Sequence, residues 1–596
     1  MRDRFGVWSL GLIASALIYG CGQPEGPQKR QAGSIVRDLI VQGSDYRLTN
    51  FSDAGFDLIY TDGFESEGEE KIHQNRVKIL WPVKLPAMST WKESVEPTVP
   101  SPQVRASYDA GNVKVIVTTG DDIGSPTSGY VCNVEVIGSQ TPISVKQDPR
   151  ILASQGHDRN NPDTDRTYTF HFRSGLVPFV TDILQTSEKN SVKIEGAQIP
   201  SIKLIGPPAD AAFVEKTTSI VARAVSRPQL PIRKNGFAPF GLSNSLYFGH
   251  TFWDMDVWVL PSMLFLQPDA VRSMNRYRLD RAAQAEKNAG EFFKKPNTGM
   301  MFPWESSVTG KETVRASSVK EHHISGSVLW GLNLSEQAGI APPPEVGKVA
   351  RGVAKFFENR SITGVSGREI KDVMSPDENH IGDNDLYTNL LAQWAMNGRK
   401  WDGPTKFKLP KDANSFLTYD NDKERGYKQA AAVLSIFPLQ YPPAEKQARV
   451  MMERFEGKVS KNGPAMSDAI HATIWARLGE KEKAYDAWKR SWEPFVKGPQ
   501  MLFSEKRSSE RTYFYTGAAG CLNTVIYGFA GFRFDDKPLD GAVWKKKLKS
   551  GWWLSCKPCL PPKWESLMIN PMIIDGQKYR VEITPEKVTI QPASGS

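Results

Sequence analysis

The chain has few cysteines, which limits how its fold can be held together. Only five cysteines occur in 596 residues, so a disulfide scaffold is excluded. Cys556 and Cys559 in SCKPCL have CxxC spacing, but no second CxxC accompanies them, which argues against zinc. A local disulfide between these two is the simplest expectation for an exported protein. Cys132 and Cys521 are expected to be buried thiols.

Blocks of like charge are also missing. The formal net charge of +9 arises from 75 basic and 66 acidic residues spread along the chain. No basic run or arginine-rich helix indicates nucleic acid as a partner, so the surplus charge is interpreted as solvated surface. The length indicates several domains, and 40% hydrophobic residues are enough to build large cores.

One apolar stretch stands near the start of the chain, behind two arginines, and no other is long enough to span a bilayer. It has the form of a secretory signal at 1–21. Its ending, Ile-Tyr-Gly-Cys, resembles a bacterial lipobox. This predicts a lipid anchor at Cys21, a tether at 22–40, and a periplasmic, outer-membrane or cell-surface lipoprotein. An ordinary cleaved signal with a chance cysteine is the alternative.

The pattern of apolar residues divides the rest of the chain. Alternating runs such as VKVIVTTG and YVCNVEVIG predict an antiparallel β-sandwich at 41–215, followed by a linker at 216–236. Helical periodicity dominates 237–533, in segments such as PEVGKVARGVAKFFENR and SDAIHATIWARLG. Residues 534–596 return to strand, with a hairpin turn at Asp575-Gly576. The predicted fold class is multidomain α+β, with a double-layered α-barrel at its centre.

The run SPDENHIGDNDLYTN at 375–389 presents a carboxylate suited to acid catalysis, Glu378. A proline disfavours helix at the residue before it, so Asp377 and Glu378 belong to a loop. The Asp-Asn-Asp cluster that follows lacks the glycine and distal glutamate of a calcium loop, and a helix cap explains it better. A loop carboxylate can equally be a cap or a solvated charge, so other segments must decide.

Two segments place a tryptophan beside a carboxylate. FGHTFWDMDVW contains Trp253 and Asp254, and GMMFPWESS contains Trp304 and Glu305. An indole covers the apolar face of a pyranose, and a carboxylate accepts hydrogen bonds from its hydroxyl groups. The pairing therefore favours a sugar-binding site, whereas core packing or helix capping is the alternative for each segment alone.

GYKQAAAV adds two hydrogen-bond donors, Lys428 and Gln429. The motif order is then FWD, FPWES, EHHISG, PDE with YTN, and KQA. This order resembles the catalytic domain of glycoside hydrolase family 65 over residues 237–533. The resemblance implies an (α/α)6 barrel flanked by an N-terminal β-sandwich and a small C-terminal β domain. It also implies inverting chemistry on α-glucosides without a metal or organic cofactor.

The resemblance implies roles for individual residues. Glu378 would be the general acid. The residues that would bind the glucose unit or support it are Trp253, Asp254, Trp304, Glu305, Glu321, His323, Lys428 and Gln429. For Glu321 and His323, support of the sugar site and plain packing both stay open.

One stretch distinguishes hydrolysis from phosphorolysis. Phosphorylases of the family hold phosphate in an HGSTLS-type stretch, whereas this chain has NGPAMS at 462–467. The proline removes an amide donor, and Ala-Met offers no hydroxyl, so the anion cradle is lost. NGPAMS resembles the hydrolytic branch, which contains kojibiose hydrolases and protein-glucosylgalactosylhydroxylysine glucosidases. In that branch water attacks, and Glu505 matches the position of the base, with Glu510 in reserve.

The expected function is therefore an inverting exo-α-glucosidase that removes a terminal glucose, α-1,2-linked as in kojibiose or glucosyl-galactose, from a disaccharide or glycoconjugate. Glu378 would be the acid and Glu505 the base, with carboxyl groups about 6.5–9.5 Å apart to admit a water. The alternatives are a phosphorylase with a different phosphate cradle and a non-catalytic glycan-binding surface lipoprotein.

Overall fold

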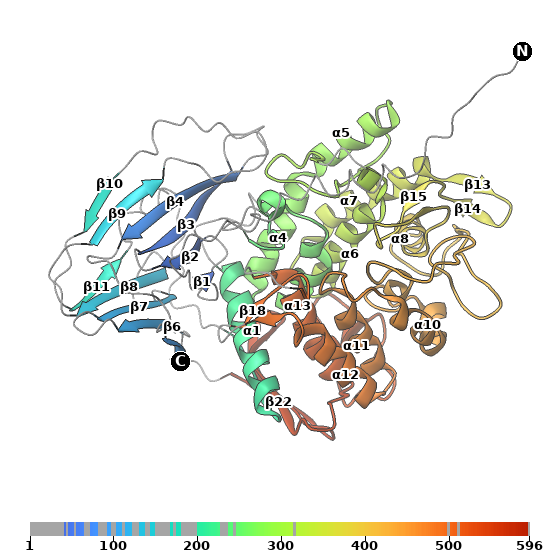
Figure 1. The fold of residues 1–596 in the computed structure, drawn as a ribbon. Coiled ribbons are helices and arrows are strands. Elements are labelled where there is room, and N and C mark those ends of the chain that lie inside the picture. The colour runs from blue at the N-terminus through green and yellow to red at the C-terminus, as the bar shows by residue number, and fades with distance from the viewer. Residues whose placement is uncertain are drawn as a thin grey trace, which may run out of the picture.

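The computed structural model describes residues 200–593 except 227–235, 242–245, 314–316, 498–500 and 509–512. Before residue 200 it describes only the backbone of eleven strands, which form two antiparallel sheets of order β1-β2-β3-β4-β9-β10 and β11-β8-β7-β6-β5 (Figure 1). Their bounds are β1 (Val41–Gln42), β2 (Tyr46–Ser52), β3 (Gly55–Phe64), β4 (Ile72–Leu80), β5 (Lys92–Glu96), β6 (Gln103–Asp109), β7 (Lys114–Asp121), β8 (Tyr130–Ile137), β9 (Ile143–Asp148), β10 (Thr167–Phe170) and β11 (Gly175–Phe179).

These strands fall within the range predicted to form the sandwich. The face-to-face packing of the two sheets stays a prediction. The signal, the tether and the lipid anchor at Cys21 lie outside the described residues, as does the side chain of Cys132. No helix in the described part of the chain has the length and apolarity to cross a membrane.

The C-terminal sheet joins a strand that precedes the helical range to three strands that follow it. Strand β12 (Ser201–Ile205) pairs antiparallel with β22 (Ser566–Ile574), followed in the sheet by β23 (Gln577–Ile583) and β24 (Val588–Pro592). Asp575 and Gly576, with φ of 53° and 77°, form the tight turn between β22 and β23. Positive φ at both central residues is what a type I′ hairpin turn requires, so the hairpin prediction is confirmed.

The boundary predicted between sandwich and linker differs from the structure. SIKLI at 201–205 pairs with the C-terminal sheet rather than with the N-terminal strands. The range assigned to a linker, 216–236, contains part of helix α1 (Pro208–Ser226), which packs on α13 (Tyr515–Asn523). Alternation of Ile202 and Leu204 as buried residues predicts a strand but does not identify its partner.

The range 237–533 is helical, as predicted. Its elements are η3 (Leu246–Gly249), η4 (Met255–Val259), α3 (Leu260–Met263), α4 (Pro268–Asp280), α5 (Ala282–Phe293), η5 (Ser317–Lys320), α6 (His323–Gln337), α7 (Pro343–Arg360), α8 (Leu386–Met396), η6 (Ala432–Ser435), α9 (Pro442–Lys446), α10 (Ala448–Phe455), η7 (Glu456–Lys458), α11 (Ser467–Arg477), α12 (Lys481–Trp492), α13 and η8 (Thr524–Phe529). Short strands β13 (Ile362–Gly364), β14 (Gly367–Glu369), β15 (Val373–Met374), β16 (Ile381–Gly382), β17 (Val496–Lys497) and β18 (Leu502–Phe503) lie among them, and β19 (Phe532–Asp535), β20 (Trp544–Lys547) and β21 (Trp553–Cys556) follow.

Contacts among these elements describe a closed ring. η4 packs against α6, α6 against α8, α8 against η6, η6 against α11, α11 against α13, and α13 returns to η4. Helices α1, α4, α7, α10 and α12 pack against members of this ring (Figure 1). A ring of inner elements with helices outside it is the arrangement that an (α/α)6 barrel requires.

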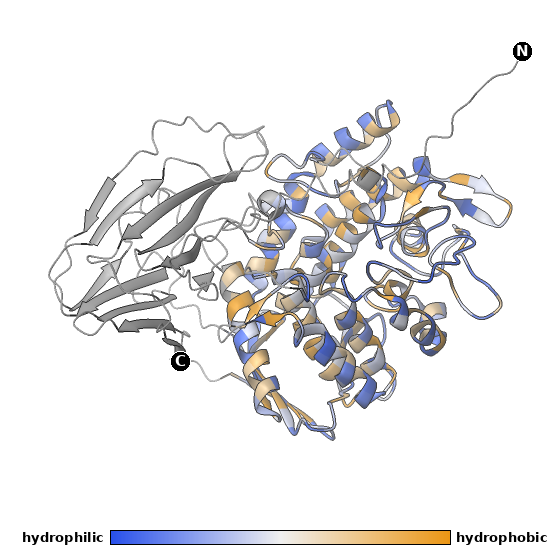
Figure 2. Cartoon of the chain, viewed as in Figure 1, coloured by the Kyte–Doolittle hydropathy of each residue, from blue (hydrophilic) through white to orange (hydrophobic). Residues whose placement is uncertain are grey.

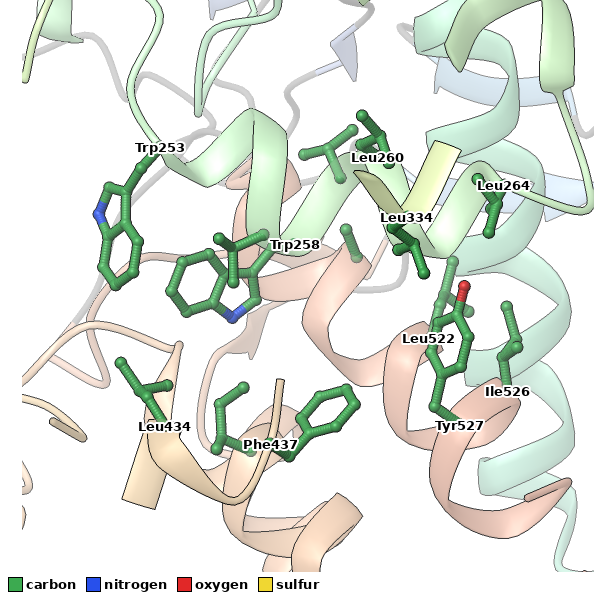
Figure 3. Close-up of a cluster of buried hydrophobic side chains, with 14 of the residues drawn as sticks. Trp253, Trp258, Leu260, Leu264, Leu334, Leu434, Phe437, Leu522, Ile526 and Tyr527 are labelled. Atoms are coloured by element: carbon green, nitrogen blue, oxygen red, sulfur yellow. The ribbon is translucent and has the colours of Figure 1, made fainter. Parts of the chain in front are cut away.

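Burial follows the same division. The inner helix α11 is buried at every residue from Ala469 to Ala476. In contrast, α7 buries only Val346, Val349, Val353, Phe356 and Phe357, a stripe with helical spacing. Figure 2 shows the corresponding mixture of hydrophobic and hydrophilic residues on the helices. Side chains such as Trp258, Leu260, Leu522 and Ile526 form the core of the ring (Figure 3).

The structure contradicts the predicted disulfide between Cys556 and Cys559. Both residues, and Cys521, are free cysteines with buried side chains. Cys556 lies in β21, where its thiol donates to the carbonyl oxygen of Ala530 at 3.0 Å. Burial raises the pKa of both Cys521, to about 12, and Cys559. The thiolate needed for redox chemistry is therefore disfavoured.

Candidate active site

Glu378 lies at the tip of a small hairpin. Strand β15 pairs with β16, with Met374 opposite Ile381, and the loop between them contains Glu378. The φ of Glu378 is 50°, and its N–H donates to the carbonyl oxygen of Ser375 at 2.9 Å. Left-handed backbone is uncommon for glutamate and persists only where surrounding contacts maintain it. The side chain is 24% exposed, so it is accessible from solvent.

Asp377 anchors this loop to another segment. It is fully buried, and its Oδ1 accepts hydrogen bonds from the backbone N–H groups of Lys428 and Gln429, the latter at 3.1 Å. Its Oδ2 contacts Nδ1 of His380, and this hydrogen bond is the main cause that raises the pKa of His380. Asp377 therefore fixes the position of the acid relative to the KQA segment, a role that the sequence did not reveal.

Lys428 and Gln429 reach Glu378 with their side chains. Nζ of Lys428 contacts Oε2 of Glu378, and Nε2 of Gln429 lies 3.4 Å from Oε1. Burial lowers the pKa of Lys428, but the charge of Glu378 and its hydrogen bond outweigh burial and leave this pKa raised. Oε1 of Gln429 is buried and accepts no hydrogen bond from the residues that the structure describes.

The NGPAMS stretch lies behind these residues. Gly463 faces the carbonyl oxygen of Lys428. The N–H of Ala430 donates to the hydroxyl oxygen of Ser467 at 2.8 Å, and the N–H of Ala465 donates to the carbonyl oxygen of Glu505 at 2.9 Å. The stretch therefore connects the KQA segment to Glu505 and uses its one hydroxyl for the backbone.

Glu505 follows β18 and belongs to the same group of charges. The hydroxyl of Tyr247 donates to Oε1 of Glu505 at 3.0 Å. Burial raises the pKa of Glu505, and the negative charge of Glu378 raises it further, while Lys506, Tyr247 and Lys428 oppose this in part. The reserve candidate, Glu510, lies outside the described residues.

Asp254 is a third carboxyl group in this cluster. Burial raises the pKa of Asp254 to about 7, opposed by the hydroxyl of Thr516, which donates to Oδ2 at 2.7 Å. The charges of Glu378 and Glu505 both add to the increase. Asp254 is consequently divided between its protonated and ionised forms near neutral pH.

Trp253, beside Asp254, is only 3% exposed. Its ring lies edge-on to those of Trp258 and His323, with centroids 4.7 and 4.6 Å away. Figure 3 shows Trp253 at the margin of the core cluster, next to Trp258. Its predicted contact with a sugar stays a prediction.

Glu305 and Trp304 are held by partners that the sequence did not indicate. Oε1 of Glu305 lies 2.6 Å from Nδ1 of His250. The backbone N–H of Trp304 donates to Oε2 of Glu312 at 2.7 Å, and its ring lies edge-on to Phe252. No sequence motif indicates His250 or Glu312 as partners, because each meets its partner only in the folded chain.

Glu321 and His323 form a buried pair close to the acid. Nε2 of His323 lies 3.0 Å from Oε2 of Glu321. Burial lowers the pKa of His323 to about 3, and burial with the charge of Glu378 raises that of Glu321 well above its ordinary value. Burial therefore disfavours the charged form of both groups. The structure thus brings Glu321 together with Glu378, Lys428 and the indole of Trp304.

Comparison with known proteins shows what the helical range is similar to. Residues 231–400 match the glycosyl hydrolase family 65 central catalytic domain. The chain is 32% identical to a kojibiose hydrolase of Mucilaginibacter mallensis over 380 residues, which are 58% of this chain and 52% of that protein. It is 30% identical to a protein-glucosylgalactosylhydroxylysine glucosidase of Danio rerio over 388 residues, 60% and 56% of the two chains.

Other relatives carry a different activity in their names. A kojibiose phosphorylase of Escherichia coli (strain K12) is 25% identical over 434 residues, 61% of this chain and 53% of that protein. The chain spans about half the length of the curated relatives that it matches. A solved structure described as a kojibiose phosphorylase from human microbiome shares the fold, with a TM-score of 0.55, 12% identity, and 93% and 92% of the two chains covered.

Proposed function

Because residues 231–400 match the glycosyl hydrolase family 65 central catalytic domain, we propose that this protein is an inverting exo-acting α-glucosidase. Its substrate is a terminal glucose in α-1,2 linkage, as in kojibiose or glucosyl-galactose. The names of the hydrolases at 30–32% identity support this substrate class. One observation carries the proposal: Glu378 and Glu505, from distant segments, lie close enough to Lys428 and to each other for their charges to interact.

The two glutamates divide the chemistry. Glu378 donates a proton to the departing glycosidic oxygen, and Glu505 takes a proton from a water on the opposite face of the ring. In the free site the ammonium group of Lys428 contacts Oε2 of Glu378. A sugar hydroxyl that accepts a hydrogen bond from Lys428 would compete with this contact and leave Glu378 facing the glycosidic oxygen.

Water is the favoured nucleophile because the NGPAMS stretch offers little to an anion. Pro464 has no N–H, and the N–H groups of Ala465 and Met466 donate to the carbonyl oxygens of Glu505 and Pro464. Asp254, Glu321, Lys428 and Gln429 would hold the sugar, with Trp253, Trp304, Glu305 and His323 around them. The alternative is a phosphorylase of the same family, and the similarity to the kojibiose phosphorylase of Escherichia coli supports it.

Product analysis tests the proposal. With kojibiose as substrate, proton NMR should show β-glucose as the first anomer released from the non-reducing end, at a rate that does not depend on phosphate. Glucose 1-phosphate formed only with phosphate would establish the phosphorylase instead. Sugar binding without any product, across α-1,2, α-1,3, α-1,4 and α-1,6 disaccharides, would favour a non-catalytic binding protein.

Replacing Gly463 by alanine is expected to lower activity by disturbing the backbone of Lys428. A Cβ at this position would lie 2.1 Å from the carbonyl oxygen of Lys428, so the backbone at residue 463 and the KQA segment must shift relative to each other. We expect kcat/KM for kojibiose to fall by about 10- to 100-fold, since small misplacements of binding groups have effects of this size. Thermal unfolding should change by a few degrees at most.

Gly457→Ala is the matched control, because nothing lies within 4 Å of a Cβ there. This variant should keep its activity. Equal activity of the two variants would contradict the role assigned to the contact between Gly463 and Lys428.

A further inference from the structure

The hydroxyl of Tyr247 donates a hydrogen bond to Oε1 of Glu505 at 3.0 Å. We propose that Tyr247 is a positioning residue for the base: it fixes the Glu505 carboxylate and leaves Oε2 to take the proton from the attacking water. This inference rests on the proposed function, because it needs Glu505 to act as a base. The hydroxyl keeps its own proton throughout, so the proton balance of the reaction is unchanged.

The backbone around Tyr247 is built to direct this side chain. Tyr247 lies in η3 and has a φ of 51°, a left-handed conformation that is unfavourable for an aromatic residue. Such a conformation persists only where surrounding contacts maintain it. Here the ring stacks on Phe240, with centroids 5.7 Å apart at 19°, and lies edge-on to Phe252, with centroids 5.2 Å apart. The ring is thus gripped on two sides while its hydroxyl reaches Glu505.

The same contacts connect the base to the predicted sugar subsite. Phe252 directly precedes Trp253 and Asp254, and its ring lies edge-on to Trp304 with centroids 5.1 Å apart. The rings of Phe240, Tyr247, Phe252 and Trp304 therefore form one continuous row. A sugar that packs on Trp304 would contact the same row of rings that holds Glu505. The row would therefore position both the reacting carbon of the sugar and the base that activates the water.

The hydrogen bond also changes how Glu505 titrates. A donor to a carboxylate stabilises the ionised form, and the Tyr247 hydroxyl accordingly lowers the pKa of Glu505 against the effect of burial. The other charges that face Glu505 are Lys506, Lys428, Glu378 and Asp254. All four remain when Tyr247 is replaced by phenylalanine, so the variant isolates the hydroxyl.

The test is the pH profile of kcat/KM for kojibiose in Tyr247→Phe. The base must be ionised, so activity rises with pH through its pKa. Without the hydroxyl this pKa rises, and we expect the ascending limb to move up by about one pH unit, with about tenfold lower kcat/KM on that limb. A purely structural role would lower activity equally at every pH and leave the limb in place.

Tyr485→Phe is the matched control. Its hydroxyl also donates to a buried carboxylate, Asp210 at 2.8 Å, in the contact between α12 and α1. This variant should keep both the limb and the activity of the wild type. A shift of similar size in Tyr485→Phe would show that the effect is not specific to the base, and would overturn the inference.

A measurement independent of turnover separates this inference from the proposed function. Carbon-13 NMR of proteins labelled at the glutamate side-chain carboxyl carbon gives the pKa of Glu505 directly, with the signal assigned from its loss in Glu505→Gln. A higher pKa in Tyr247→Phe supports the contact even if Glu505→Gln hydrolyses kojibiose normally, in which case only the base assignment fails. An unchanged pKa, with Glu505→Gln inactive, overturns the role of Tyr247 alone.

Discussion

Glu378→Gln is expected to lose about 10³-fold in kcat on kojibiose, because an amide cannot donate the proton that the leaving oxygen needs. The loop should keep its shape, since Asp377 and its hydrogen bonds to the backbone of Lys428 and Gln429 are untouched. Initial rates at saturating kojibiose, with glucose measured enzymatically, give this loss directly.

A substrate whose leaving group needs no proton tests whether Glu378 acts as the general acid. On α-glucosyl fluoride the same variant should lose less than about tenfold, since fluoride departs without general acid help. Glu345→Gln on α7 is the matched control, because this carboxylate is 46% exposed and pairs with Arg276 at the surface. It should behave as the wild type on both substrates. Full activity of Glu378→Gln on kojibiose would contradict the assignment of Glu378 as the general acid.

Glu505→Gln is expected to lose about 10³-fold in kcat on kojibiose and on α-glucosyl fluoride alike, because water must be deprotonated whatever group departs. The pair of variants therefore separates acid from base by their response to the leaving group. Addition of phosphate should restore nothing. Restoration by phosphate, with glucose 1-phosphate as product, would mean that phosphate is the natural nucleophile.

Loss of activity in Glu505→Gln should not come from unfolding. Burial raises the pKa of Glu505, so the folded state accommodates a neutral group at this position better than a charged one. The glutamine oxygen can still accept the hydrogen bond from Tyr247. We expect a melting temperature equal to or above that of the wild type, measured by circular dichroism. A large decrease would show that the carboxylate has a structural role.

Local patterns in the sequence predicted the features of the fold that are determined by residues close together in the chain. The stripe on α7, the turn at Asp575 and Gly576, and the loop that carries Glu378 each follow from spacing or from one proline. The cap of α8 likewise follows, because Asp385 accepts from the N–H of Thr388 at 2.8 Å. In each case the energetic preference acts over a few residues, so a short window of sequence contains it.

Long-range pairing could not be predicted in this way. Nothing near Tyr247 indicates a left-handed backbone or a partner at Glu505, because both arise from rings and loops that meet only in the fold. The partners of Glu305 and Asp377 were missed for the same reason. CxxC spacing suggested a disulfide, yet Cys556 and Cys559 are free, since the spacing says nothing about where the backbone directs each thiol, and only Cys556 lies in strand β21.

The pairing of β12 with β22 has a consequence for the order in which the protein is made. Ser201 and Asn570, which lie opposite each other, are separated by 369 positions. On the ribosome, β12 therefore emerges long before its partner strand exists, with its hydrogen-bonding edge and its apolar face uncovered. α1, which follows β12, must likewise wait for α13. Folding of the helical ring can proceed during synthesis, but β12 gains its partner only after residues 566–574 have been added.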